Sequence, residues 1–238
     1  MIKGFNDKFT IKLDTSACTS CISGHSTELN DTWYYKDLTF ESGKIYGLVS
    51  EYGLGCEYLS YFLGGRIEFE EVRVYCSGTP ISRQDLCDVS WNLEPSREPY
   101  GKNQVKRSIE KVLSRRSDTM SFQDITGKFL LTEERYSRKF TELSGERWRA
   151  SSAYGYAQNK RIYFAPYNSS AFYERMCSSN LLKALHELTD SGALVVLPVG
   201  SDEFIKHIAD EVIYLGKSYN IAELKNFNTA FFGEDWVH

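Results

Sequence analysis

A glycine-rich loop between an apolar run and a helix-like segment is the feature that most constrains the fold of this chain. The apolar run covers Ile45–Val49, and the loop continues as Ser-Glu-Tyr-Gly-Leu-Gly from position 50 to 55. Apolar residues at positions 59, 62 and 63 then fall on one face of a helix. Strand, glycine loop and helix, in this order, are the context of a Walker A phosphate-binding loop. The sequence therefore predicts an α/β protein built around a P-loop.

The loop has kept glycines but lost its charged residue. In the pattern Gly-x-x-x-x-Gly-Lys-Ser/Thr, Ser50 stands at the first glycine and Gly55 at the second, with Gly53 between them. Cys56 replaces the lysine, and Glu57 replaces the hydroxyl residue that holds magnesium. A P-loop binds phosphate through backbone N–H groups, a helix N-terminus and that lysine. The chain therefore lacks the cation that this type of site needs.

Glu57 is expected to change the electrostatics of the loop further. A carboxylate in the first turn of a helix is favoured by the helix dipole. We therefore expect Glu57 to occupy the anion site itself and to repel phosphate. Each of the two altered charge pairs is worth up to about 4 kcal/mol at about 4 Å with an effective dielectric near 20. This predicts a loss of several orders of magnitude in ATP affinity, and for the chain alone it favours a plain strand–helix turn in which Glu57 starts the helix.

Composition limits the class of protein. The chain has 238 residues, 42% of them apolar and 25% charged, with a net charge of −4. These values fit one globular domain spanning 1–238 and argue against nucleic acid as the main partner. No run approaches the roughly 18 apolar residues of a membrane span, and positions 1–7 contain no apolar signal region. With no secretory signal, the six cysteines are interpreted as free thiols in a reducing, cytoplasmic compartment.

A possible metal-binding pattern lies near the N-terminus. Cys18-x-x-Cys21 followed by His25 could supply three ligands. A structural zinc site needs four, and no fourth ligand lies nearby. We therefore expect no metal site.

The remaining pattern divides the chain into three parts. Strand-like alternation at 9–13, 33–40 and 72–75 indicates antiparallel strands, with an irregular stretch at 14–31. Positions 91–101 are expected to be a loop, and they open a helical insert over 91–142, with helices at 102–117 and 122–140. In the second half, helices at 144–158, 172–188 and 203–210 alternate with strands at 161–165, 193–197 and 211–215, which indicates parallel βαβ units. Residues 217–238 form a tail without clear periodicity.

The helix predicted at 102–117 carries a strongly basic face. Its cations are Lys106, Arg107, Lys111, Arg115 and Arg116. A docking surface and a plain solvated helix face both fit this pattern, and the second is the commoner reason for a run of charge.

Four segments in order resemble the nucleotide-binding domain of ABC ATPases over nearly the whole chain. Positions 38–48 resemble the strand and turn that lead into Walker A, and Leu-Ser-Gly-Glu-Arg at 143–147 resembles the ABC signature with one glycine missing. Positions 157–165 are similar to the run into Walker B, and 208–215 to the last strand of the family. The resemblance implies an antiparallel β subdomain, a RecA-like mostly parallel sheet core and a helical insert.

The departures from this family fall at its catalytic positions. After the strand at 161–165 the family has Asp-Glu-Pro, whereas this chain has Pro166, Tyr167 and Asn168. The switch histidine corresponds to Gly200, and the magnesium-sensing glutamine to position 93 or 94, which are Leu and Glu. The adenine-stacking aromatic expected near 26–29 is absent. Phosphoryl transfer to water needs a metal clamp and a positioned water. We therefore predict no catalytic residues and no ATPase activity by the chain alone.

The signature-like segment keeps its chemistry. In the family each ATP site is shared between two subunits, and the signature of one meets the γ-phosphate bound to the other. Ser144, Gly145 and Glu146 retain a hydroxyl, an uncrowded N–H group and a helix start. The resemblance thus implies a subunit that binds no nucleotide tightly alone but completes an ATP/Mg site in a partner. The alternative is that Ser144 merely caps the helix, with Glu146 in its first turn.

The implied partners are an intact ABC ATPase and a membrane-spanning transporter subunit, which would place the chain at the inner face of a membrane. Three alternatives remain open at this point. A homodimer would contain two sites without catalytic residues. An active ATPase would need an unusual carboxylate, of which Glu174 is the closest candidate. A scaffold or regulator would work without any transporter.

Overall fold

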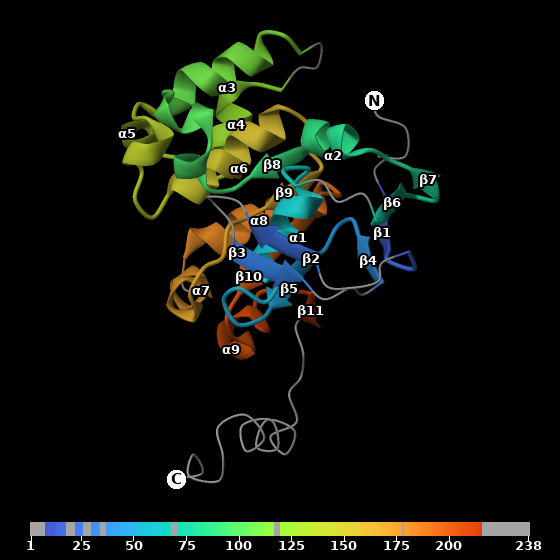
Figure 1. Cartoon of the computed structure of the whole chain (residues 1–238). Coiled ribbons are helices and arrows are strands. Elements are labelled where there is room, and N and C mark those ends of the chain that lie inside the picture. Colours follow the sequence, from blue (N-terminus) through green and yellow to red (C-terminus); the bar gives the residue numbers. More distant parts are fainter. Residues whose placement is uncertain are drawn as a thin grey trace, which may run out of the picture.

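Five parallel strands form the centre of the computed structural model (Figure 1). The structure describes residues 8–17, 22–25, 30–33, 37–67, 71–116, 120–177 and 179–215. The strand order in the parallel sheet is β11-β5-β10-β9-β8, and every neighbouring pair is parallel. The strands are β5 (Ile45–Val49), β8 (Ser90–Asn92), β9 (Ile162–Phe164), β10 (Leu194–Val199) and β11 (Glu211–Tyr214). This confirms the predicted parallel core.

An antiparallel sheet packs beside this core. Its order is β4-β1-β6-β7, and a separate two-stranded pair joins β2 and β3. These strands are β1 (Thr10–Asp14), β2 (Ile22–His25), β3 (Asn30–Trp33), β4 (Leu38–Glu41), β6 (Arg73–Cys76) and β7 (Thr79–Pro80). The predicted strand at 33–40 is thus wrong in extent, because β3 ends at 33 and β4 begins at 38. Positions 34–36 lie outside the described residues.

The helices lie on both sides of the parallel sheet. They are α1 (Cys56–Leu63), α2 (Arg83–Val89), α3 (Val105–Leu113), α4 (Phe122–Lys128), α5 (Glu133–Tyr136), α6 (Arg147–Ala157), α7 (Ser170–Cys177), α8 (Asn180–Asp190) and α9 (Asp202–Ile205). Short 3₁₀ turns cover Pro95–Arg97, Pro99–Lys102 and Phe140–Glu142. In Figure 1, α3 to α6 form a helical layer at one end of the molecule, with α3 at its outer edge.

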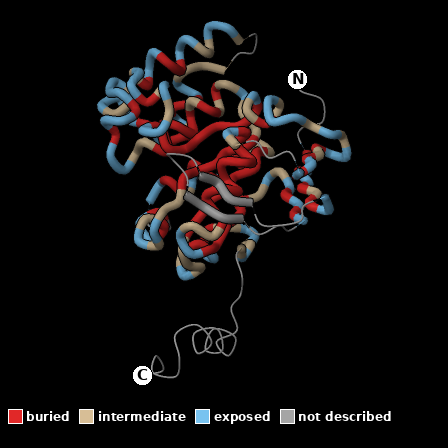
Figure 2. The backbone as a smooth tube through the Cα atoms, in the orientation of Figure 1, coloured by how far each residue is buried: buried red, intermediate tan, exposed pale blue. Residues whose placement is uncertain are grey.

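Alternation along the central strands divides the interior into two cores. In β10, Leu194 and Val196 contact the core that includes α1 and the antiparallel sheet. Val195 and Leu197 contact the core that includes α3 to α8. All six residues of β10 are buried, which is why this strand reads as a continuous apolar run rather than an alternating one. Figure 2 shows this burial through the central strands and exposure along the outer helices.

Several sequence-based boundaries need correction. The predicted loop at 91–101 contains the end of β8, an edge strand too short to show periodicity. The single helix expected at 172–188 is two helices, because the hydroxyl of Ser179 accepts a hydrogen bond from the N–H of Leu181 and starts α8 there. The helix expected at 122–140 ends at 128, and Leu130 then adopts a left-handed φ of 53°. The helix α2 was not predicted at all, although Ser82 and Asp85 form a capping box.

Within the described ranges, none of the helices is both long enough and apolar enough to span a bilayer. The tail at 217–238 lies outside the described residues, and so do positions 26–29, where the family would have an adenine-stacking aromatic.

Candidate functional site

The candidate site lies at the carboxyl ends of the parallel strands, where the glycine loop leaves β5. In open α/β sheets, ligands bind at this edge, where neighbouring strands lead into different connections. Gly53 and Gly55 have φ values of 82° and 110°. Both values lie in the left-handed region that glycine adopts without steric cost. The backbone curvature expected of a phosphate-binding loop is therefore present.

Three hydrogen-bonding groups of the loop, however, are directed back into the loop. The backbone N–H of Cys56, at the start of α1, donates to the hydroxyl of Ser50 at 3.2 Å. That hydroxyl in turn donates to the carbonyl of Glu51 at 3.0 Å, and the N–H of Leu54 donates to the same carbonyl at 3.1 Å. The amide that would face a bound phosphate is thus engaged by a side chain of the protein.

Two contacts fix part of the surroundings of Glu57, the residue expected to occupy the anion site. Its carboxylate is buried, with 5% of the residue exposed. One carboxylate oxygen accepts the backbone N–H of Tyr167 at 3.2 Å and lies 3.5 Å from the Arg97 guanidinium. Because a buried carboxylate needs hydrogen bonds and a countercharge, these two partners determine where Glu57 points. Its negative charge is partly offset by Arg97, and the expectation that Glu57 repels phosphate stays a prediction.

Tyr167 fills the space beside the loop. Its ring packs edge-on against Tyr52, with the centroids 5.3 Å apart. Its hydroxyl lies where a Cβ atom of residue 200 would be, so Gly200 leaves room for it. Burial raises the pKa of Tyr167, and the neighbouring Cys56, Glu51 and Glu57 raise it further. The phenol is therefore neutral at physiological pH and adds no charge to the site.

These contacts bring together the positions at which the chain departs from the ABC pattern. Pro166 and Tyr167 follow β9, and Gly200 follows β10. Tyr167 contacts Glu57 through its backbone and Gly200 through its side chain. The structure thus places Glu57, Tyr167 and Gly200 next to one another. What these residues do in the protein remains a prediction.

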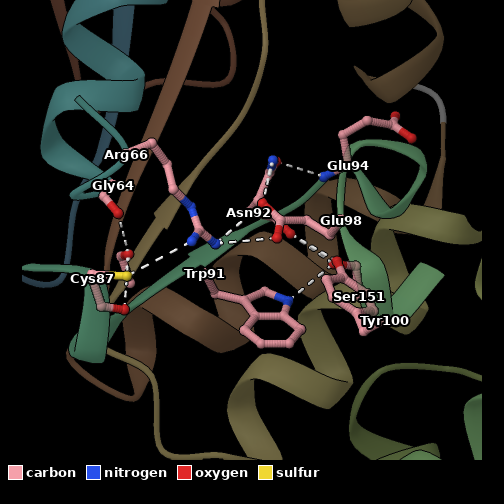
Figure 3. Close-up of polar contacts among 10 residues, drawn as sticks. Gly64, Arg66, Cys87, Trp91, Asn92, Glu94, Glu98, Tyr100 and Ser151 are labelled. Atoms are coloured by element: carbon pink, nitrogen blue, oxygen red, sulfur yellow. Dashed lines mark hydrogen bonds and ion pairs between the residues drawn. The ribbon is translucent and has the colours of Figure 1, made fainter. Parts of the chain in front are cut away.

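The segment after β8 contains Glu94, which the sequence pointed to, and Arg97 and Glu98, which it did not single out (Glu94 and Glu98 in Figure 3). Glu94, placed near the missing glutamine, is buried and lies 2.9 Å from Arg147 and 3.1 Å from the indole nitrogen of Trp148. Glu98 pairs with Arg66 at 3.1 Å and accepts the side-chain amide of Asn92 at 3.0 Å. In the sequence, this segment shows a Glu-Pro pair at 94–95, another at 98–99, and an arginine between them. Charged loops of this kind are common, so the pattern alone does not predict these contacts.

The signature-like segment lies on the surface before α6. Ser144 and Gly145 are exposed, and a Cβ added to Gly145 would meet no atom within 4 Å. The helix begins at Arg147, and its N-cap is Glu146, whose side chain makes no capping hydrogen bond. The alternative in which Ser144 caps the helix is therefore wrong, because the helix starts two residues too late. Glu146 turns toward Arg149 and lies 3.6 Å from Arg135.

A metal site finds no support in the part of the chain that is described, where no three His, Cys, Asp or Glu residues gather. Cys18 and Cys21 lie outside the described residues, so that pattern is not tested. Cys56, Cys76 and Cys87 are free thiols.

Comparison with known proteins identifies the fold. No protein-family model matches the sequence, and no curated protein sequence matches it. Among solved structures, CbiO1 from Clostridium perfringens, part of the ABC transporter complex CbiONQ, aligns with a TM-score of 0.65 and 12% identity over 93% of this chain and 95% of its own. The dimeric bacterial ABC transporter cassette MJ0796 aligns with a TM-score of 0.62 and 16% identity over 87% and 94%.

A putative ABC transporter ATP-binding protein from Pyrococcus furiosus has the same TM-score and identity, over 87% of this chain and 97% of its own. At these identities the likeness concerns architecture and not activity. It agrees with the central parallel sheet, the antiparallel sheet and the helical layer described above. The chain has the fold of the ATP-binding cassettes of ABC transporters.

Proposed function

We propose that this chain is a catalytically silent ABC-type subunit that pairs with a competent ABC ATPase and completes the ATP site of that partner. The observation that carries the proposal is an asymmetry between two surfaces. In its own P-loop, the amide of Cys56 and the carboxylate of Glu57 are engaged within the protein, whereas Ser144 and Gly145 of the signature-like segment are exposed.

The residues at the P-loop do not fit Mg-ATP. Cys56 supplies no cation, and Glu57 at the magnesium position is held by Arg97 and the N–H of Tyr167. Pro166 and Tyr167 offer neither the carboxylate that binds the metal nor the one that positions water. We therefore derive no hydrolytic step at this loop. None of the contacts described here involves Glu174, the carboxylate that an active ATPase would need.

The exposed signature-like segment supports a role toward a partner. A Cβ at Gly145 would lie in open space, so the packing of this chain does not itself require glycine there. A surface that must approach a phosphate would require it, because a side chain would block the backbone N–H. MJ0796, which has the same fold, is a dimer. We infer a heterodimer of cassettes joined to a membrane-spanning subunit, at the cytoplasmic face of a membrane.

Two glycines make a matched test. Gly145 and Gly127 are both exposed, and neither would clash as a larger residue. The chain should be isolated with its natural partners, identified by pull-down from the native cell, and the ATPase rate of the complex measured. Gly145→Asp places a carboxylate beside the partner's γ-phosphate and should lower the rate at least about tenfold. Gly127→Asp should leave the rate unchanged.

The proposal makes a second demand on the isolated chain. Alone, it should not hydrolyse Mg-ATP above the background of a mock preparation. Hydrolysis by the isolated chain, or equal rates for the two glycine variants in the complex, would contradict the proposal. Co-purification with only a second copy of itself would favour the homodimer.

A further inference from the structure

A row of unneutralised cations lies along the exposed side of α3. Arg107, Lys111 and Arg115 follow one another at four-residue spacing and are exposed, the last of them in the turn after the helix. Residues at this spacing share one face of a helix, and like charges there destabilise it. In the neighbouring row, opposite charges at the same four-residue spacing stabilise the helix, since Lys106 lies 3.9 Å from Glu110. The cationic row therefore opposes helix stability, and helix formation does not explain it.

The row has no ion-pair partner among the residues that the structure describes. Within the described ranges, no ion pair involves Arg107, Lys111, Arg115 or the nearby Lys102. The opposite face of α3 is occupied, since Val105 and Ile109 are buried in the core. The cations thus stand on the outer side of the helical layer, where α3 forms its edge (Figure 1).

The row joins two surface cavities. One, of about 620 Å³, is lined by four cations and by one carboxylate, Glu142, which is already paired with Lys139 at 3.3 Å. Neutral hydrogen-bonding groups complete this cavity, contributed by Asn103, Gln104, Ser108, Ser137 and Tyr154.

The second cavity, of about 560 Å³, lies at the C-terminal end of α6. Its cations are Arg115, Arg116 and Lys160. Two of these are oriented by backbone carbonyls, since Arg116 donates to the carbonyl of Ala157 at 2.7 Å and Lys160 to that of Asp88 at 2.6 Å. Both cavities therefore present positive charge from defined positions, in a chain whose net charge is −4.

We propose that this surface, the α3 row with its two cavities, binds an acidic peptide segment of a partner protein. Arginine guanidinium groups recognise carboxylates by paired hydrogen bonds, and the neutral groups of the first cavity can bond a peptide backbone. The nine residues of α3 span about 14 Å at 1.5 Å per residue, a length that four or five residues of an extended peptide would match.

Other anionic partners fit this surface less well. The hollows beside the row also carry the side chains of Asn103, Gln104 and Ser137, which can bond a peptide backbone and which binding to a bilayer would not need. The row is short and the chain as a whole is acidic, which disfavours nucleic acid. The inference does not depend on the proposed role at the ATP site of a partner, because no P-loop or signature residue takes part.

The test uses the full chain and a defined probe. Fluorescein-labelled octaglutamate is titrated with the protein by fluorescence anisotropy at about 50 mM salt, where screening of exposed charges is weak, with octaglutamine as the neutral probe. The variant Arg107→Glu/Lys111→Glu/Arg115→Glu should bind octaglutamate about tenfold or more weakly, as expected from the loss of three exposed ion pairs. Arg107→Gln/Lys111→Gln/Arg115→Gln should weaken binding in the same direction without introducing repulsion.

A charge-matched control separates this surface from general attraction. Lys8, Lys12 and Arg73 are exposed on and beside the antiparallel sheet, so Lys8→Glu/Lys12→Glu/Arg73→Glu makes the same change in net charge. It should alter binding less than about twofold. Absence of octaglutamate binding, or equal weakening by both triple variants, would overturn the proposal. So would sedimentation with phosphatidylglycerol vesicles that depends on the α3 row while octaglutamate fails to bind, since that outcome assigns the surface to a membrane.

Discussion

Tyr167 and Gly200 are interdependent at the level of single residues. The Tyr167 hydroxyl occupies the position of a Cβ at residue 200, and its ring leans on Tyr52. A histidine at position 200, as the switch position of the ABC pattern has, would require the Tyr167 side chain to move. The loss of the switch residue and the gain of the tyrosine are thus two parts of one local arrangement that fills the space beside the loop.

This interdependence predicts a non-additive pair of substitutions. Gly200→Ala should lower the free energy of unfolding by about 1 kcal/mol, because the added methyl group displaces Tyr167. In a Tyr167→Phe background the same change should cost less, since the hydroxyl is gone and the next ring atom would be 3.3 Å from the methyl group. Urea denaturation of the four proteins measures the coupling. An equal cost of Gly200→Ala in both backgrounds would refute the contact.

At the level of elements, the segment after β8 connects the P-loop helix to the helical layer. Glu94 is held by Arg147 and Trp148 of α6. Three residues later Arg97 reaches Glu57 in the first turn of α1, and Glu98 reaches Arg66 just beyond the end of α1. Within the five residues 94–98, Glu94 is therefore held by α6, whereas Arg97 and Glu98 are held by residues in or just after α1. Glu57 is therefore part of this connection.

The Arg97–Glu57 pair gives a prediction for this connection. Arg97→Gln should destabilise the protein by about 1–2 kcal/mol, because the buried carboxylate of Glu57 loses its countercharge. The value lies at the low end of the range for buried pairs because Arg97 is 46% exposed and its charge is screened by solvent.

Glu57→Gln supplies the control, since its amide oxygen can still accept the N–H of Tyr167. Adding Glu57→Gln to Arg97→Gln should recover part of the lost stability, as measured by urea denaturation. If the double variant is as unstable as the sum of the two single variants, the charges do not interact.

At the level of the whole molecule, contacts within the protein occupy part of the P-loop and its surroundings. The P-loop closes on itself through Ser50, and its neighbourhood is filled by Tyr52 and Tyr167. A ligand that binds the folded state stabilises it by RT ln(1 + [L]/Kd). If ATP binds weakly, its presence should barely change thermal stability.

Mg-ATP at about 1 mM should therefore raise the Tm of the isolated chain by less than about 1–2 °C, since a Kd above this concentration gives under about 0.4 kcal/mol. Differential scanning fluorimetry or calorimetry measures the shift, with Mg²⁺ alone as the reference. A rise of about 5 °C or more would show tight binding and would contradict the proposed loss of the nucleotide site.

Local patterns in the sequence were sufficient for the architecture. The glycine loop predicted the strand, turn and helix around it, because Gly53 and Gly55 meet a backbone requirement that few other residues can. The apolar runs predicted the parallel strands, because both faces of such strands are buried. The role of the signature-like segment stays a prediction, and the sequence did not give the residue at which the helix after it begins.

Only the tertiary structure decided what surrounds the site. Nothing local to Glu57 indicates that its carboxylate pairs with Arg97, 40 positions away in the chain, or that the Tyr167 hydroxyl takes the space beside Gly200. The break between α7 and α8 and the short β8 were missed for a related reason, since a single capping hydrogen bond and an edge strand leave little periodicity to detect. Sequence determined where the chain turns and which faces are apolar, because these depend on neighbouring residues. The charge and filling of the site depend on side chains that only folding brings into contact.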